Sequence, residues 1–151
     1  MNAAKVSRPE SEIAGNIVHE HEALREKVHG IHCVLAEHDP NPGEIETLLR
    51  EFLNALVIHF SHEEEEGFFQ EIAAKTPHNV PRADKLCVEH RELLHEADAL
   101  CRFAEAGSPS MQWWRELSSR CHEFSRRLMQ HECEENRLLQ EAHMVNGHSN
   151  N

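Results

Sequence analysis

The chain has 151 residues, which is enough for a single domain with a sizeable hydrophobic core. Its 27 acidic residues outnumber its 15 basic residues, and the net charge of −12 argues against nucleic acid or an anionic membrane surface as a partner. No apolar run approaches the roughly 18 residues of a membrane span, and the N-terminus carries no apolar signal segment. With five cysteines and no C-x-x-C pair, we expect reduced thiols in a cytoplasmic protein.

The first part of the chain predicts an arm followed by a long helix. Residues 1–10 are polar and favour a flexible N-terminal arm. Apolar residues then recur at helical spacing and predict a helix over residues 11–38. The segment 39–43 contains two prolines and a glycine and ends this helix. Asn41, followed by Pro42, is typical of the N-cap of a second helix.

The rest of the chain continues the same pattern. The second helix fades after residues 67–69, and the segment 76–81 is expected to be a loop. Apolar periodicity predicts a third helix over residues 82–105. Ser108, followed by a proline, is the expected cap of a fourth helix, and residues 143–151 are expected to form a disordered tail.

The predicted elements define a fold class. No segment alternates polar and apolar residues with a period of two, so the chain is expected to be all-α. Four long amphipathic helices with short connections predict an up-down-up-down four-helix bundle over residues 11–142. The two helical hairpins repeat each other with a pseudo-twofold relation, because His90 follows His21 by 69 residues and His131 follows His59 by 72.

The repeated unit is a lone histidine followed, one helix later, by His-x-x-x-Glu. A histidine and a glutamate four residues apart lie one above the other on one face of a helix. At about 100° per residue, these side chains fall on the apolar stripes of their helices. Six polar side chains are therefore predicted to face one interior: His21, His59, Glu63, His90, His131 and Glu135.

These six side chains predict a metal site. Burying an unpaired carboxylate costs several kcal/mol, against a total stability of roughly 5–15 kcal/mol, and a bound metal removes that penalty. Mixed imidazole and carboxylate ligands without a thiolate favour iron or manganese. The Glu-x-x-His strings of ferritin-like di-iron bundles occur at Glu26 and Glu92, but both point off the apolar stripe. The H-E-x-x-H string of zinc proteases is absent.

Other polar residues have simpler interpretations. His19, His62 and His95 lie off the apolar stripes, and His32 is expected to be a structural histidine away from the site. Glu64 is a candidate hydrogen-bond partner for a metal ligand. Of the cysteines, Cys133 is expected on an outer face, and three others are expected to be small core residues: Cys87, Cys101 and Cys121.

Four strings in order resemble the hemerythrin-like (HHE cation-binding) domains, in their H…HxxxE…H…HxxxE subgroup. The resemblance covers residues 11–142. It implies a carboxylate-bridged non-haem di-iron centre, with two iron ions and an oxo or hydroxo bridge, inside a four-helix bundle. The strings are Glu20-His21-x-x-Leu24, His59-x-x-x-Glu63-Glu64 followed by Phe68, Glu89-His90-x-x-Leu93, and His131-x-x-x-Glu135.

Carried over residue by residue, the resemblance implies which side chains hold each iron. Oxygen-carrying hemerythrins have a further histidine and an aspartate where this chain has Leu94 and Asn136. With five ligands on each iron, both irons would keep an open position, which weakens the case for a simple oxygen carrier. In this assignment His21 and His59 hold one iron, His90 and His131 hold the other, and Glu63 and Glu135 bridge them.

The resemblance implies a small ligand such as O2, NO or H2O2 at the centre. One hypothesis is a protein that binds and reacts with this ligand, as in peroxide disproportionation or nitric-oxide reduction. The alternative is a sensor of iron, oxygen or NO, or an iron-handling protein, without turnover. The choice between these functions, the choice between iron and manganese, and the oligomeric state remain open at this point.

Overall fold

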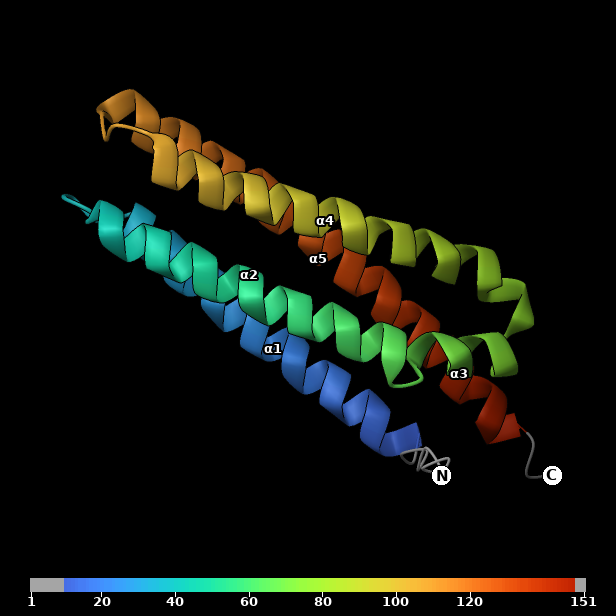
Figure 1. Ribbon diagram of the computed structural model, residues 1–151. Coiled ribbons are helices and arrows are strands. Elements are labelled where there is room, and N and C mark those ends of the chain that lie inside the picture. Colours follow the sequence, from blue (N-terminus) through green and yellow to red (C-terminus); the bar gives the residue numbers. More distant parts are fainter. Residues whose placement is uncertain (1–9, 149–151) are drawn as a thin grey trace, which may run out of the picture.

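The computed structural model describes residues 10–148, and no strand occurs in that range. Each long helix contacts the next along the chain, and the fourth closes the ring by contacting the first. Figure 1 shows the two hairpins side by side, with both hairpin turns at the same end. The predicted all-α, up-down-up-down four-helix bundle is confirmed. Its long helices are α1 (Glu10–Leu35), α2 (Pro42–Glu65), α4 (Val80–Ala106) and α5 (Met111–His148).

Side-chain caps begin two of these helices. At α2, Asn41 accepts a hydrogen bond from the backbone N–H of Gly43 at 2.8 Å, and Pro42 is the first helical residue, as predicted. At α5 the cap is Ser110, whose Oγ accepts from the N–H of Trp113 at 3.1 Å, and the prediction of Ser108 was wrong. The predicted first helical residue, a proline, instead belongs to the connection before the helix.

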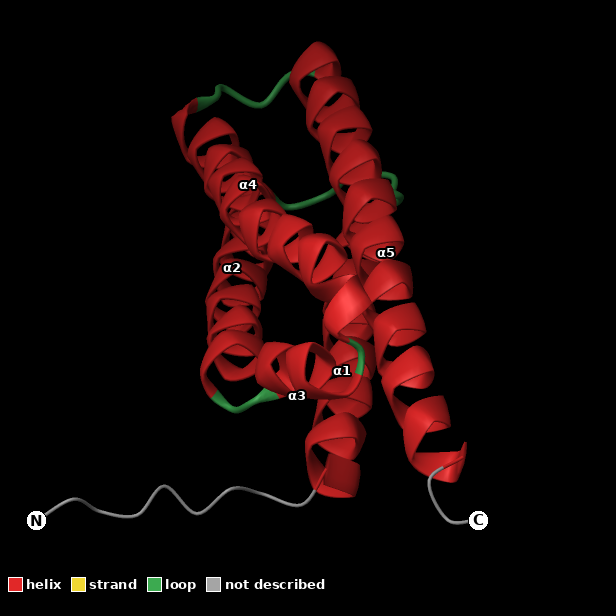
Figure 2. Cartoon of the chain, turned by 90° about the vertical axis from the view of Figure 1, so that its right-hand side faces the viewer, coloured by secondary structure: helices red, strands yellow, loops and turns green. Residues whose placement is uncertain are grey.

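A short helix crosses the end of the bundle opposite the hairpin turns (Figure 2), and a 3-10 helix follows it along the chain. The sequence predicted only a fading helix after residues 67–69 and a loop over 76–81, so both helices were missed. Gly67 adopts a left-handed φ of 105°, which glycine tolerates without strain, and this turn separates α2 from the next helix. Phe68 and Ile72 can then pack inward, where both are fully buried. The two elements are α3 (Phe68–Lys75) and the 3-10 helix η1 (Pro77–Asn79).

The ends of the bundle also differ from the prediction. α1 ends at Leu35, three residues before the predicted end. α5 is helical through His148, where the sequence predicts a disordered tail from residue 143. Leu138, Leu139 and Ala142 are buried, so α5 packs on the bundle up to the start of the predicted tail. Residues 1–9 of the predicted arm and residues 149–151 of the predicted tail lie outside the described residues. Within those residues, no helix is long and apolar enough to cross a membrane.

The hydrophobic core is divided into two clusters along the bundle axis. The larger cluster fills the end near the hairpin turns and includes Leu24, Phe60, Leu93 and Leu128. The smaller cluster lies under α3 and contains Ile17, Phe68, Ile72, Ala83, Leu86, Leu138 and Leu139. On α1, α4 and α5, the predicted polar side chains lie between residues of the two clusters, and on α2 they lie on either side of Phe60, at the end of the larger cluster. The core therefore brackets a polar layer.

Candidate metal centre

The polar layer consists of the six side chains that helical periodicity predicted to face inward. Each side chain belongs to a residue that is at most 2 % exposed. One comes from α1, two from α2, one from α4 and two from α5, so every long helix contributes. The prediction that they point into one interior is confirmed. They are His21, His59, Glu63, His90, His131 and Glu135.

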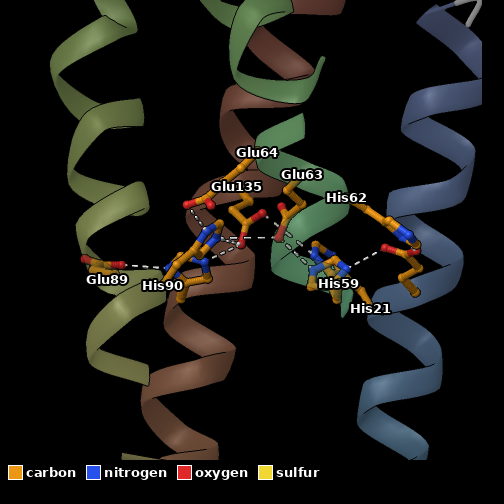
Figure 3. A network of polar contacts seen from close by, with 10 residues as sticks. His21, His59, His62, Glu63, Glu64, Glu89, His90 and Glu135 are labelled. Carbon is orange, nitrogen blue, oxygen red and sulfur yellow. Dashed lines mark hydrogen bonds and ion pairs between the residues drawn. The ribbon is translucent and has the colours of Figure 1, made fainter. Parts of the chain in front are cut away.

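These side chains form two groups of four that share both carboxylates. Within each group, one nitrogen or oxygen from every residue lies within 4.8 Å of those of the others. Figure 3 shows Glu63 and Glu135 between the imidazole of His90 on one side and that of His59 on the other. The first group is His21, His59, Glu63 and Glu135, and the second is Glu63, His90, His131 and Glu135.

The helical repeat creates the closest contacts. On α2, Nε2 of His59 lies 2.8 Å from Oε1 of Glu63, one turn further along the helix. The same arrangement on α5 brings Nε2 of His131 against Oε1 of Glu135. The His-x-x-x-Glu spacing thus positions an imidazole and a carboxylate together, twice.

Contacts between helices complete each group. Nε2 of His90 lies 3.6 Å from Oε1 of Glu63 and 3.9 Å from Oε1 of Glu135. Nε2 of His21 lies 4.0 Å from Oε2 of Glu135. Each carboxylate therefore faces imidazoles from other helices as well as its own, which is the position that a bridging ligand would need.

Three further carboxylates hold the histidines from outside the layer. The sequence flagged Glu64 for this role but missed Glu20 and Glu89. Both immediately precede a buried histidine, and this repeated Glu-His pair was the available signal for them. A glutamate next to an inward-facing histidine lies at the edge of the buried face, where it can reach the neighbouring helix. Nδ1 donates to a carboxylate in three pairs: His59 to Glu20 at 2.7 Å, His131 to Glu89 at 2.8 Å, and His90 to Glu64 at 3.2 Å.

These outer hydrogen bonds determine what faces the interior. A neutral imidazole that donates through Nδ1 presents a lone pair at Nε2. The four Nε2 atoms and the four oxygens of Glu63 and Glu135 are all buried, and none has a hydrogen-bond partner in the described structure. Buried acceptors that face one another are costly unless a cation or protons lie between them. The layer is thus built to hold positive charge.

The pKa values follow from this burial. Burial lowers the pKa of His21 to about 3 and that of His90 to about 2, so both imidazoles are neutral near pH 7. Burial also acts to lower the pKa of His59, but Glu63 and Glu20 outweigh it and raise the pKa. Burial raises the pKa of Glu63. Without a metal, the His59–Glu63 pair therefore retains a proton that a cation would displace.

The remaining histidines lie where the sequence placed them, with one addition. His19 and His95 are exposed, and Nε2 of His32 pairs with Oγ of Ser125 at 2.9 Å, away from the layer. His62 lies off the apolar stripe, but its Nδ1 donates to Glu20 at 2.5 Å. It therefore belongs to what we call the outer ring, which is Glu20, Glu64 and Glu89 together with the hydrogen bonds that they accept from histidines. The two Glu-x-x-His strings are exposed, as predicted: Glu26 with His29, and Glu92 with His95.

The cysteines do not take part in either ligand group. All five are free thiols. Cys101 and Cys121 are buried in the larger core cluster, and Cys87 is half-buried, which agrees with the expected packing role. Cys133 is exposed on α5, as predicted.

Two surface clefts reach the outer ring from opposite sides. A cleft of about 300 Å³ between α4 and α5 is lined by His131 and Glu89. A cleft of about 200 Å³ between α1 and α2 is lined by His59 and Glu20 in the same way. The pseudo-twofold repeat thus extends to the surface, and the His131–Glu89 and His59–Glu20 hydrogen bonds each lie beside a cleft.

Comparison with known proteins identifies the family. A search of curated proteins and a search of solved structures each gave no significant match to the chain. The family model described as the hemerythrin HHE cation binding domain matches residues 12–142, nearly the whole chain. The match includes most of α1 and α5, all of α2 and α4, and every residue of the buried layer. The chain therefore belongs to the hemerythrin HHE cation-binding domain family.

Proposed function

We propose that the chain is a non-haem di-iron protein that binds and reacts with O2, NO or H2O2. The observation that carries this proposal is the sharing of both buried carboxylates by two ligand groups. A single ion would need only one group, whereas two ions side by side need ligands that bridge. In this arrangement His21 and His59 hold one iron, His90 and His131 hold the other, and Glu63 and Glu135 bridge them.

The chemistry of the donor atoms supports iron or manganese. Imidazole nitrogen and carboxylate oxygen suit iron and manganese, and the thiolates that would favour softer ions are not part of the groups. The buried acceptors also require positive charge for a stable fold. A pair of divalent cations supplies that charge and leaves the imidazoles unprotonated. A protonated imidazole has no lone pair at Nε2 and could not bind a metal.

Four protein atoms per metal leave room for a small ligand. Two imidazoles and one oxygen from each carboxylate occupy fewer positions than octahedral coordination offers. When bound, an iron pair supplies the electrons for reduction of O2, NO or H2O2. The residues of the chain orient the donors through the outer carboxylates, and the two hydrophobic clusters exclude bulk water from both ends of the layer.

Elemental analysis of protein purified without a histidine tag tests the metal assignment. Two irons per chain, with the near-ultraviolet absorption of an oxo-bridged ferric pair, are the expected result. Two manganese ions per chain would keep the ligand set but replace the metal. Zinc, or about one metal per chain, would contradict the di-iron proposal.

Turnover assays separate the reactive protein from a sensor or an iron-handling protein. The iron-loaded protein should disproportionate H2O2 catalytically, or reduce NO catalytically when a chemical reductant is added, and Glu63→Gln should abolish that consumption. Binding of NO or O2 without repeated turnover would favour a sensor or an iron-handling protein, whose function depends on whether the centre is occupied. That alternative is supported by mass action, because metal binding stabilises the folded bundle.

A further inference from the structure

The pseudo-twofold repeat places equivalent donors in both halves of the centre, but the outer ring is unequal. We name the N-terminal position by His21 and His59 and the C-terminal position by His90 and His131. Both positions share Glu63 and Glu135. A difference between the positions must therefore come from the groups that hold the imidazoles from outside.

At the C-terminal position, each imidazole has its own carboxylate. Nδ1 of His131 donates to Glu89 at 2.8 Å, and Nδ1 of His90 donates to Glu64 at 3.2 Å. Figure 3 shows Glu64 reaching toward His90 from the turn that also carries Glu63. A carboxylate on Nδ1–H fixes the ring and makes Nε2 a stronger donor to a metal.

At the N-terminal position, one imidazole shares its carboxylate with another histidine, and the other imidazole has none. Nδ1 of His59 donates to Glu20 at 2.7 Å, but Nδ1 of His62 donates to the same carboxylate at 2.5 Å. Nδ1 of His21 is buried and meets no hydrogen-bond partner in the described structure. The polar side chain beside His21 is Asn136, whose neutral amide acts against the lowering of the His21 pKa.

The repeat explains this difference at the level of sequence. Glu63 corresponds to Glu135, so the residue that corresponds to Glu64 is Asn136. A carboxylate in one half is thus a neutral amide in the other. Hydrogen bonds to a charged acceptor are roughly twice as strong as those to a neutral one. The chain carries three imidazole–carboxylate pairs at its centre where the repeat would allow four.

We propose that the two positions bind metal with different affinity: the C-terminal position binds more tightly and fills first, and the N-terminal position is the exchangeable one. The inference rests on the proposed function, since it assumes two metals at one centre. Loss of one outer carboxylate typically lowers metal affinity about 10–100-fold, and we expect a difference of that size between the positions.

Half-site variants measure the two positions separately. His21→Ala leaves the C-terminal position complete, and His90→Ala leaves the N-terminal position complete. The probe is ferrous ion, added anaerobically to metal-free protein in competition with a chelator. We expect His21→Ala to bind one equivalent about 10–100-fold more tightly than His90→Ala does. Equal affinities, or tighter binding by His90→Ala, would overturn the inference.

A second pair of variants tests whether the outer ring causes the difference. Asn136→Asp adds a carboxylate beside His21 and should tighten binding at the N-terminal position. Glu64→Gln keeps the size of the side chain but removes its charge, and should weaken the C-terminal position. Glu65→Gln, an exposed acid on the same turn, is the matched control and should change neither. Both variants should be made in the half-site backgrounds, with helical content followed by circular dichroism.

The two proposals fail in distinguishable ways. Wild-type protein that binds fewer than two metal ions at saturation contradicts the di-iron centre itself. Two ions at saturation, with half-site affinities that Asn136→Asp and Glu64→Gln do not move, contradict only the unequal positions. Should Asn136→Asp fail to fold, Glu64→Gln alone decides the cause, because it removes no volume from the core.

Discussion

Nε2 of His59 lies 2.8 Å from Oε1 of Glu63, and both atoms are acceptors once Nδ1 of His59 has donated to Glu20. Two buried acceptors at this distance repel each other unless a proton or a cation lies between them. The same conflict recurs between His131 and Glu135 on α5. The polar layer is therefore stable only when protons or cations lie between its buried acceptors.

Replacing Glu63 by glutamine should separate stability from metal binding. Without a metal, the buried His59–Glu63 pair has to take up a proton, whereas the neutral amide can donate to Nε2 of a neutral His59, so the unfolding free energy of the metal-free protein should rise by about 1–3 kcal/mol. Metal content should fall, because an amide is a poor bridging ligand. Urea unfolding of chelator-treated protein and elemental analysis measure the two effects. Glu65→Gln should change neither. Retention of two metals with unchanged affinity would show that Glu63 does not bridge.

The phase of α2 can be tested with its two histidines. His59→Ala should lose metal from the N-terminal position, because His59 supplies a donor atom there. His62→Ala should retain both metals, because Nδ1 of His62 bonds Oε1 of Glu20 and His62 is in neither ligand group. The number of metal ions per chain, measured on both variants purified in parallel, shows which of the two histidines binds metal. Loss of metal in His62→Ala together with retention in His59→Ala would reverse the assignment of the two residues.

The sequence predicted the buried layer well because its signal is local. A helix rotates by about 100° per residue, so the apolar neighbours of His21 or His90 determine the direction of that side chain without knowledge of the partner helix. The partners of Glu20 and Glu89 could not be predicted in the same way. Each carboxylate bonds a histidine on the adjacent helix, and that contact depends on how the two helices pack side by side.

The missed elements have a different cause. α3 spans only eight residues, too few for a periodic pattern, and its position depends on the left-handed turn at Gly67. The burial of Phe68 beneath it is a tertiary effect. The cap of α5 was misplaced because Ser108 and Ser110 are both plausible caps, and only packing of Trp113 against the end of the bundle selects the second.

The connection between α4 and α5 should tolerate no side chain at Gly107. A Cβ there would overlap the indole of Trp113, which is buried and stacked parallel to Phe103 with ring centroids 6.2 Å apart. Gly107→Ala should therefore lower the unfolding free energy by about 1–3 kcal/mol, as overpacking does.

Gly30→Ala is the matched control for that substitution. Gly30 lies within α1, and an added Cβ would have no described atom within 4 Å apart from its chain neighbours and the nearby backbone of its own helix. The variant should be more stable than the wild type by about 0.5–1 kcal/mol, because alanine favours the helix. Thermal unfolding of both variants gives the comparison. Equal shifts in one direction would contradict the packing of Trp113 against this glycine.

The stability of the metal-free protein should fall as the pH drops below about 6.5. Burial lowers the pKa of His21 to about 3 and that of His90 to about 2, whereas both titrate near 6.5 in the unfolded chain. Below pH 6.5 the two imidazoles bind protons in the unfolded state but not in the folded state. Each imidazole therefore lowers the unfolding free energy by about 2 kcal/mol at pH 5. His59 acts in the opposite direction, because its pKa is raised and it gains a proton in the folded state.

His90→Gln removes one of the two neutral imidazoles and should reduce the loss of stability between pH 7.5 and pH 5 by about 2 kcal/mol. Urea unfolding in the presence of a chelator, at both pH values, measures it. His95→Gln is the control, since His95 is exposed on the same helix and should leave the pH dependence unchanged. An identical pH dependence in His90→Gln and the wild type would mean that His90 has the same pKa in the folded and the unfolded state, so that burial does not exclude a proton from its ring. In that case protons would compete with a metal for Nε2 of His90 below about pH 6.5, and the C-terminal position would not hold a preformed neutral imidazole there.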